Sequence, residues 1–301
     1  MRCHKPFRPE NEKLMKKGIL FFLLGLLTLK VSAQVPTEKT LLWEIKAPGA
    51  SKSSYLFGTI HLICPDDFYL SDALKSAITK TEQVALEMDM DDPAMMGKMM
   101  QTMNMKPGNQ LSKLVSDAEY KRLAKFYKDS VGVGLAMFEN AKPFVLMGPL
   151  FTSVLGCEPK SYEMALVELA GKQKSEVIGL ETVEEQMGIF DTIPYKDQVK
   201  MLLSMIDSLP QARKEFRDLV NLYKSENIQE LYTATTKSSF GMEENQDIML
   251  YDRNKKWIGR IKNIIAEKST LFAVGAAHLG GEKGVIALLR KEGYTVTSVK
   301  Q

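Results

Sequence analysis

A chain of 301 residues, 45% of them hydrophobic and 26% charged, is long enough and apolar enough to fold around a sizeable core. Its formal net charge of +3 would by itself leave nucleic acid or an anionic membrane open as partners. The basic excess lies in residues 1–33, however, which contain seven of the 40 Lys/Arg and two of the 37 Asp/Glu. The rest of the chain has 33 basic and 35 acidic side chains, a net charge of −2, which argues against both partners.

Residues 1–33 are predicted to be a secretory signal peptide. Two lysines at 16–17 precede the apolar run 19–29, and the small residues that a signal peptidase reads follow it. The run is shorter than the about 20 residues of a membrane-spanning helix, and no later stretch is apolar enough to span. We therefore expect export to the periplasm or the extracellular space and no transmembrane segment in the mature chain. Met15 opens a signal peptide of ordinary shape by itself, so Met1 and Met15 are both candidate start residues.

The first part of the mature chain reads as strands that end in polar side chains. A short strand and a turn lead into the strand 54–60, which stops at His61. After a loop and a helix, the strand 83–88 ends at Glu87 and Asp89. These strands predict a sheet whose ends carry candidate functional groups.

A methionine-rich helix follows Pro93. Eight methionines lie between Met88 and Met105, and five of them share one helical face: Met95, Met96, Met99, Met100 and Met103. Because thioethers fill irregular gaps, this face is typical of a core or cover helix. The alternatives are a flexible wall for varied substrates and a copper(I) site. The pattern favours core or groove over copper.

Helices dominate the remainder, with further strands between them. The strand 176–180 ends at Glu181, and the strand 271–275 leads to His278. A helix at 285–291 and a strand at 295–299 close the chain. This uneven alternation predicts an α/β (α+β-like) fold with a mixed sheet. We expect a single domain, 34–301, with large helical insertions at about 93–175 and 182–268.

Two cysteines, Cys64 and Cys157, remain after the predicted cleavage. In an oxidising compartment they are most simply read as one disulfide. Two separate buried thiols are the alternative. A third reading, Cys64 as a ligand beside His61, is weaker because loop residues follow it.

Four polar side chains follow the interior strands: His61, Glu87, Glu181 and His278. If these strands run parallel, all four lie along the carboxyl edge of the sheet, where α/β folds place their sites. Two histidines with a glutamate are a metal-ligand set that leaves a position open for water. A histidine at a strand end is more often a hydrogen-bonded structural residue. The mature chain has only these two histidines, however, and both stand in a Gly-x-x-His frame, which favours a shared site.

Several motifs occur in one order along the chain: Gly58-Thr59-Ile60-His61, Ala85-Leu86-Glu87-Met88-Asp89, Gly179-Leu180-Glu181-Thr182 with Gln186, Arg253-Asn254 with Trp257, and Gly275-Ala276-Ala277-His278-Leu279 with Gly281 and Gly284. Together they resemble the TraB/PrgY/GumN family, which is related to the Tiki metalloproteases, over nearly the whole mature chain. The resemblance implies a domain similar to the erythromycin-esterase/ChaN-like fold. In the Tiki branch it implies a metal-dependent peptidase that manganese or cobalt supports.

Residue by residue, the resemblance implies a central site of three side chains: His61, Glu87 and His278. Its supporting polar groups would be Glu181 and Arg253. Asp89 and Glu163 are further candidates for supporting groups. Many family members have an aspartate in a Gly-x-Asp segment where this chain reads Ser161-Tyr162-Glu163.

These residues predict hydrolysis by a metal-activated water, with a peptide or protein as substrate. Manganese, cobalt or zinc would lower the pKa of the water. Glu181 would act as general base, and Arg253 would stabilise the developing oxyanion. The roles of Glu87 and Glu181 are exchangeable in this mechanism, and a salt bridge from Arg253 to Glu163 or Glu181 is the structural alternative to the catalytic role of Arg253. A serine hydrolase is disfavoured because no Gly-x-Ser-x-Gly elbow is present.

The alternative function is a non-catalytic protein on the same scaffold that binds a metal, haem or a peptide. For a peptide, the methionine-rich helix would line the groove.

Overall fold

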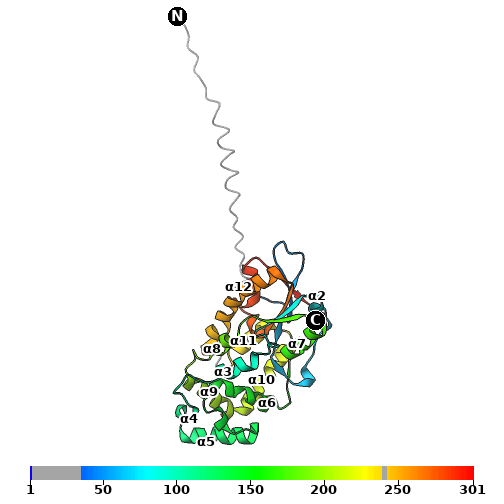
Figure 1. The fold of residues 1–301 in the computed structure, drawn as a ribbon. Helices are drawn as coiled ribbons and strands as arrows, with labels where there is room; N and C mark the ends of the chain where they lie inside the picture. The colour runs from blue at the N-terminus through cyan, green and yellow to red at the C-terminus, as the bar shows by residue number, and fades with distance from the viewer. Residues whose placement is uncertain (2–34, 239–242) are drawn as a thin grey trace. The chain divides into compact units, whose positions relative to one another are not determined.

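A mixed sheet of six strands organises the chain in this computed structural model, which describes residues 1, 35–238 and 243–301 (Figure 1). The strands lie in the order β6-β4-β7-β2-β1-β8. Their bounds are β1 (Leu42–Lys46), β2 (Ser54–Thr59), β4 (Gln83–Leu86), β6 (Glu176–Gly179), β7 (Thr270–Gly275) and β8 (Thr295–Val299). The predicted α/β class with a mixed sheet is confirmed. The predicted signal peptide lies outside the described residues.

Four neighbouring strands of this sheet, β6, β4, β7 and β2, run parallel. Strand β1 is antiparallel to both of its neighbours, β2 and β8. β4 and β7 are buried along their whole length, as expected for central parallel strands. The carboxyl ends of the four parallel strands therefore meet at one edge of the sheet.

A second, two-stranded sheet follows the carboxyl end of β2. In it, β3 (Leu62–Ile63) pairs antiparallel with β5 (Lys160–Ser161). Just beyond these strands Cys64 and Cys157 form a disulfide with their Cα atoms 5.9 Å apart. Strands of two residues carry no periodic pattern, so the sequence did not predict this pairing.

Helices flank the sheet and fill the segments between its strands (Figure 1). Their bounds are α2 (Asp72–Lys80), α3 (Met95–Thr102), α4 (Leu111–Leu114), α5 (Asp117–Phe126), α6 (Met147–Leu155), α7 (Tyr162–Gln173), α8 (Val183–Ile189), α9 (Tyr195–Asp207), α10 (Leu209–Lys224), α11 (Ile228–Thr236), α12 (Asp252–Glu267) and α13 (Val285–Lys291). Short 3-10 or π-helical turns are η1 (Pro65–Asp67), η2 (Tyr127–Val131), η3 (Leu135–Phe138), η4 (Pro143–Leu146), η5 (Glu243–Asn245), η6 (Asp247–Tyr251) and η7 (Ala276–His278). Helix α8 begins with a capping box of Thr182 and Glu185.

In the described part of the chain, buried apolar side chains form three clusters. The largest packs the sheet against its flanking helices. A second joins α4, α5, α6 and α9, which are grouped together in Figure 1. The third packs α3 against α8 through Met95, Met99, Met187 and neighbouring side chains, whereas Met96 and Met100 stay exposed. The methionine face is thus partly a cover for α8 and partly surface.

Within the part of the chain that the structure describes, no helix combines the length and the apolarity needed to cross a membrane.

Candidate functional site

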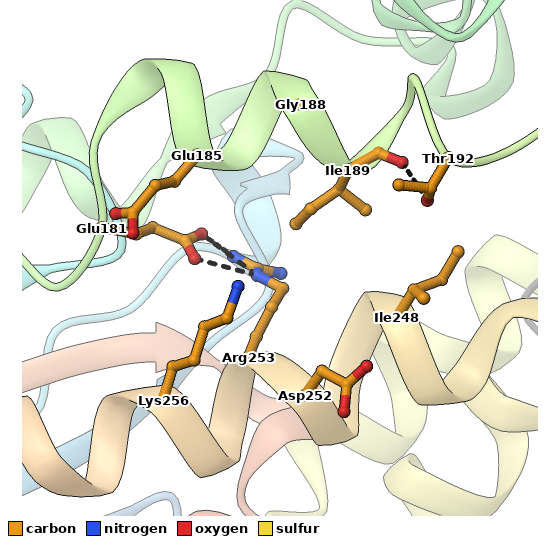
Figure 2. Close-up of a pocket in the computed structure, with 9 residues that line it drawn as sticks. All are labelled: Glu181, Glu185, Gly188, Ile189, Thr192, Ile248, Asp252, Arg253 and Lys256. Carbon is orange, nitrogen blue, oxygen red and sulfur yellow. Dashed lines mark hydrogen bonds and ion pairs between the residues drawn. The ribbon is translucent and has the colours of Figure 1, made fainter.

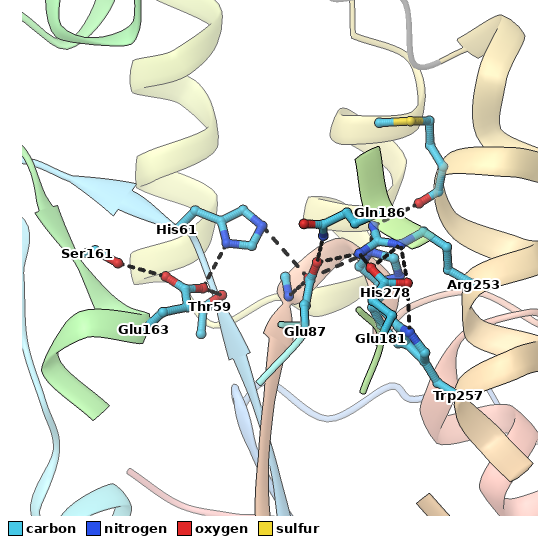
Figure 3. A network of polar contacts seen from close by, with 12 residues as sticks. Thr59, His61, Glu87, Ser161, Glu163, Glu181, Gln186, Arg253, Trp257 and His278 are labelled. Carbon is cyan, nitrogen blue, oxygen red and sulfur yellow. Dashed lines mark hydrogen bonds and ion pairs between the residues drawn. The ribbon is translucent and has the colours of Figure 1, made fainter. Parts of the chain in front are cut away.

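The carboxyl edge of the parallel strands brings the four predicted side chains into one network (Figure 3). They follow β6, β4, β7 and β2 in the order Glu181, Glu87, His278 and His61. Three of them are buried, whereas 58% of the His61 side chain is accessible to solvent. The network can therefore be reached from the His61 side.

The centre of the network is Oε1 of Glu87. Nε2 of His61 and Nε2 of His278 each lie 3.9 Å from this oxygen. The N–H of Gly275 donates to it at 2.9 Å. A Cβ atom at position 275 would lie 3.2 Å from Nε2 of His61 and 3.4 Å from Oε1 of Glu87. The missing side chain of Gly275 therefore keeps open the space that the two imidazoles and the carboxylate border.

His61 is held by the carboxylate of Glu163. Nδ1 of His61 lies 2.7 Å from Oε1 of Glu163, whose oxygens also accept hydrogen bonds from Thr59 (2.6 Å) and Ser161 (3.0 Å). Partial desolvation of the ring works to lower the pKa of His61, but the charge and hydrogen bond of Glu163 outweigh it and raise that pKa to about 9. When His61 is neutral, its remaining proton stays on Nδ1 beside the carboxylate, and the lone pair is on Nε2.

The backbone of His61 has a φ of 42°, in the left-handed region. Residues other than glycine use this region sparsely, although histidine tolerates it better than most. Such backbone strain concentrates at functional sites. At His61 this left-handed backbone conformation belongs to the turn that directs the imidazole toward Glu87.

His278 follows β7 on the turn η7 and is held by the amide of Asn254. Nδ1 of His278 lies 2.6 Å from Oδ1 of Asn254. Nδ2 of the same amide donates to the carbonyl oxygens of His278 (3.3 Å) and Lys283 (2.9 Å), so Oδ1 is the acceptor and Nδ1 of His278 the donor. Burial, followed by the charge of Arg253, lowers the pKa of His278 to about 3. His278 is therefore neutral at pH 7, with its lone pair on Nε2.

Arg253 of α12 links the two buried glutamates. Nη2 donates to both Glu87 and Glu181, and Nε donates to Glu181 at 3.0 Å. Nη1 donates to the carbonyl oxygen of Met249 at 3.2 Å and lies 3.2 Å from Nε2 of His278. Met249 stands on the π-helical turn η6 just before α12, and such turns are frequent at functional sites.

All four carboxylate oxygens of Glu87 and Glu181 have partners. Oε2 of Glu181 accepts a hydrogen bond from Nε1 of Trp257 at 3.2 Å, and Oε2 of Glu87 accepts one from Gln186 at 3.0 Å. Burial works to raise the pKa of Glu87, but Arg253 and the two histidines hold it well below its usual range. Glu87 is therefore an ionised carboxylate in the core of the protein.

A pocket of about 270 Å³ adjoins the network at Glu181 and Arg253 (Figure 2). Ile189 and Ile248 supply apolar parts of its wall. The charged side chains of Asp252 and Lys256 line it as well, and both residues are exposed. The pocket is thus an amphipathic space next to the candidate site.

Two predicted candidates lie outside the network. Oδ1 of Asp89 is buried and has no hydrogen-bond partner among the described residues, and burial and the neighbouring Asp91 raise the pKa of Asp89. Cys64 is bonded to Cys157 and presents no thiolate. Over residues 35–238 and 243–301, no three His, Cys, Asp or Glu side chains are already arranged to hold a metal ion.

The network also contains side chains to which the sequence analysis assigned no role: Thr59, Ser161, Gln186, Asn254 and Trp257. All except Ser161 stand in the motifs that carry the family resemblance, and that membership was the available signal. No sequence pattern pointed to Ser161.

Comparison with known proteins gives a family match and distant relatives. A model of the TraB/PrgY/gumN family matches residues 41–298. The chain is 24% identical over 318 residues to "Metalloprotease TIKI2" of Danio rerio, covering 85% of this chain and 60% of that protein. It is 23% identical over 332 residues to "Metalloprotease TIKI1" of Homo sapiens, covering 90% of this chain and 64% of that protein.

The chain thus spans about 60% of the length of these curated relatives. No solved structure matches it, so the erythromycin-esterase/ChaN-like part of the fold prediction stays a prediction. The family match, in contrast, covers most of the sequence. The chain belongs to the TraB/PrgY/gumN family.

Proposed function

We propose that this chain is an exported, metal-dependent peptidase whose divalent metal is held by His61, His278 and Glu87. The observation that supports this most is the approach of both Nε2 atoms to one oxygen of Glu87, at 3.9 Å each. The names of the relatives, which describe metalloproteases, point in the same direction.

The donor set fits a divalent metal. Two imidazole nitrogens and a carboxylate oxygen are ligands that zinc, cobalt and manganese accept. Bonds of about 2 Å place the ligands of one ion roughly 3–3.5 Å apart, so the 3.9 Å contacts would have to close by about half an ångström. The partners of the two Nδ1 atoms also fit, because metal-binding histidines usually donate their other N–H to a carboxylate or another oxygen.

The space over Gly275 is a second point of fit. A methyl group there would touch Nε2 of His61 and Oε1 of Glu87, and it would lie 3.6 Å from Cδ2 of His278. All three proposed ligands therefore border one small cradle. An ion in it would also offset the buried carboxylates of Glu87, Glu163 and Glu181, for which Arg253 and a protonated His61 supply positive charge among the described residues.

The residues around the proposed metal position would have different roles. When bound, a divalent metal lowers the pKa of water and polarises a substrate carbonyl. Glu163 and Asn254 orient the two imidazoles, and Arg253 and Gln186 hold Glu87.

Glu181 was predicted as general base, but both of its oxygens are taken by Arg253 and Trp257. The geometry therefore favours Glu87 as the ligand and Glu181 as a positioning residue that acts through Arg253. The predicted exchange of these two roles is disfavoured for the same reason.

The test uses Gly275→Ala. The φ of Gly275 is −51°, which alanine adopts without strain, so we expect the free energy of unfolding to stay within about 1 kcal/mol of wild type. Binding of Mn²⁺ or Zn²⁺, measured by calorimetry, and metal-dependent cleavage of a peptide library should both be lost. Gly259→Ala is the matched control, because a Cβ built there meets no described atom within 4 Å apart from its chain neighbours and its own helix backbone.

His61→Ala and His278→Ala complete the experiment. Peptide cleavage that survives both substitutions and chelation of the metal would refute the proposal. Metal binding that needs both histidines, without cleavage of any peptide, would favour the alternative of a binding protein.

A further inference from the structure

We propose that Arg253 occupies the metal-facing lone pair of His278 in the metal-free protein, so that an incoming metal must displace Nη1 of Arg253 and Arg253 sets the metal affinity. This inference rests on the proposed function and adds a competitor within the chain. It assigns Arg253 a role other than the predicted stabilisation of an oxyanion.

The first step is that His278 has a single lone pair to offer. The amide of Asn254 is fixed by two carbonyl oxygens, so its oxygen must accept the proton of Nδ1 of His278. The lone pair is then on Nε2, where Nη1 of Arg253 lies 3.2 Å away. A lone pair that accepts a hydrogen bond cannot bind a metal ion at the same time.

The second step is that the guanidinium is held by many contacts, of which His278 is only one. Its other N–H groups reach Glu87, Glu181 and the carbonyl oxygen of Met249. The guanidinium carbon also lies 4.8 Å from the ring centroid of Trp257. After a small shift that breaks the contact with His278, the remaining contacts would keep Arg253 near Glu87 and Glu181.

The third step is that the guanidinium has room to withdraw. Arg253 lines the pocket of about 270 Å³ that it shares with Glu181 (Figure 2). A small shift toward that pocket would release Nε2 of His278 without breaking into packed core.

The fourth step concerns charge. Glu87, Glu163 and Glu181 are each only 7% exposed, and Arg253, at 8%, is the buried guanidinium that pairs with two of them. Arg253 therefore supplies positive charge where the metal would supply it. Only molecules in which Arg253 has withdrawn can bind the metal. The apparent affinity is therefore the intrinsic affinity multiplied by the fraction of molecules in that conformation.

Titration with Zn²⁺ of the whole chain and of Arg253→Gln tests this. We expect Arg253→Gln to bind Zn²⁺ at least about tenfold more tightly by calorimetry, which corresponds to about 1.4 kcal/mol. Its metal-free form should melt at a lower temperature than wild type, and saturating Zn²⁺ should raise its melting temperature by more than it raises that of wild type.

Arg260→Gln is the matched control. Arg260 lies two turns further along α12 and pairs with Glu185, outside the network. This variant should bind Zn²⁺ as wild type does.

The outcomes separate this inference from the proposed function. Equal or weaker Zn²⁺ binding by Arg253→Gln, while wild type binds Zn²⁺ in a manner that His61→Ala abolishes, overturns the inference alone. No binding of Zn²⁺, Mn²⁺ or Co²⁺ by wild type or by Arg253→Gln overturns both.

If Arg253→Gln does not fold, crystal structures of wild type with and without Zn²⁺ decide the question. The contact between Nη1 and Nε2 should be present without zinc and broken when zinc is bound to His278. Zinc on His61 and Glu87 with that contact intact would refute the inference.

Discussion

The surroundings of His61 and those of His278 show two ways of fixing an imidazole at the same sheet edge. His61 lies at the surface on a left-handed backbone, and its partner is the carboxylate of Glu163. His278 lies in the core with 5% of its side chain accessible, and its partner is the neutral amide of Asn254. Its ring also packs on Trp257, with 4.5 Å between ring centroids.

The difference teaches that equal Gly-x-x-His frames do not make equivalent histidines. The strand and the turn set where each imidazole lies, but partners distant in sequence set its charge. Glu163 favours the protonated form of His61, whereas burial and Arg253 favour the neutral form of His278. The following predictions test whether the two environments are independent.

Loss of the disulfide should have the largest effect on the free energy of unfolding, and its local effect should be confined to the surroundings of His61. Cys64 follows β3 and Cys157 precedes β5, so the bond joins the loop after His61 to the segment that leads to Glu163. Replacing both cysteines with serine should lower the free energy of unfolding by about 3 kcal/mol, because the open chain regains loop entropy. Urea unfolding measures this.

The local result sharpens the comparison. The NMR signal of the His61 ring should shift in the double-serine variant, and that of His278 should not. A reducing agent should reproduce both effects in wild type and do nothing to the variant. Equal shifts of the two rings would mean that the environments are coupled.

Removing the amide of Asn254 should have the next largest effect on the free energy of unfolding, and this effect should arise only in the surroundings of His278. Asn254→Ala leaves the buried Nδ1–H of His278, the carbonyl oxygen of His278 and the partly buried one of Lys283 without the amide as partner. We expect a loss of about 2–3 kcal/mol in the free energy of unfolding. Asn221→Ala, at an exposed position of α10, is the control and should change it by less than about 0.5 kcal/mol. If Asn254→Ala lowers the free energy of unfolding as little as Asn221→Ala does, burial and not the amide fixes His278.

Much of this site could be predicted from the sequence because its residues follow strands. Apolar runs that stop at His61, Glu87, Glu181 and His278 fix the positions of these side chains along the chain, and parallel pairing then brings them to one edge. Local signals also mark helix starts, because Ser71 caps α2 and Thr182 with Glu185 forms the capping box of α8.

The partners could not be predicted because they depend on contacts between distant segments. Glu163 was only a candidate supporting group, and its contact with His61 spans 102 positions. The contact between Arg253 and Glu181 spans 72 positions. Nothing in the sequence of α12 indicates that Arg253 and Trp257 together occupy both carboxylate oxygens of Glu181. The protonation of each imidazole depends on such contacts, so the sequence frame alone could not distinguish the two histidines.

Glu163→Gln should have a smaller effect on stability and a clear effect on pH dependence in the metal-free protein. Because Glu163 raises the pKa of His61 from its ordinary 6.5 to about 9, the pair stabilises the fold fully below pH 6.5 and loses this contribution as the pH rises through 9. Solvent reaches 58% of the His61 side chain, so we expect only about 1 kcal/mol at pH 6.

The measurement is a pair of NMR titrations with unfolding curves at pH 6 and pH 9. The pKa of His61 should fall by at least about one unit in Glu163→Gln, and the stability difference from wild type should shrink at pH 9. Glu168→Gln, on the exposed surface of the same helix α7, is the control. If the pKa of His61 does not fall, the carboxylate of Glu163 does not set the protonation of His61.

Glu185→Gln should have the smallest effect and shows what burial adds. Like Glu181, Glu185 pairs with an arginine of α12, but the side chains of Glu185 and Arg260 are 37% and 38% accessible. Glutamine keeps the capping box of α8, so the substitution removes only the ion pair, and we expect a loss of about 0.5 kcal/mol or less at pH 7. The hydrogen bond from Arg260 lowers the pKa of Glu185 to about 2, so this contribution is present above pH 4.5 and disappears as the pH falls toward 2. Urea unfolding of both proteins at pH 7 and pH 3 measures it, and a loss at pH 7 as large as that of Asn254→Ala would contradict the view that burial makes the contacts of α12 strong.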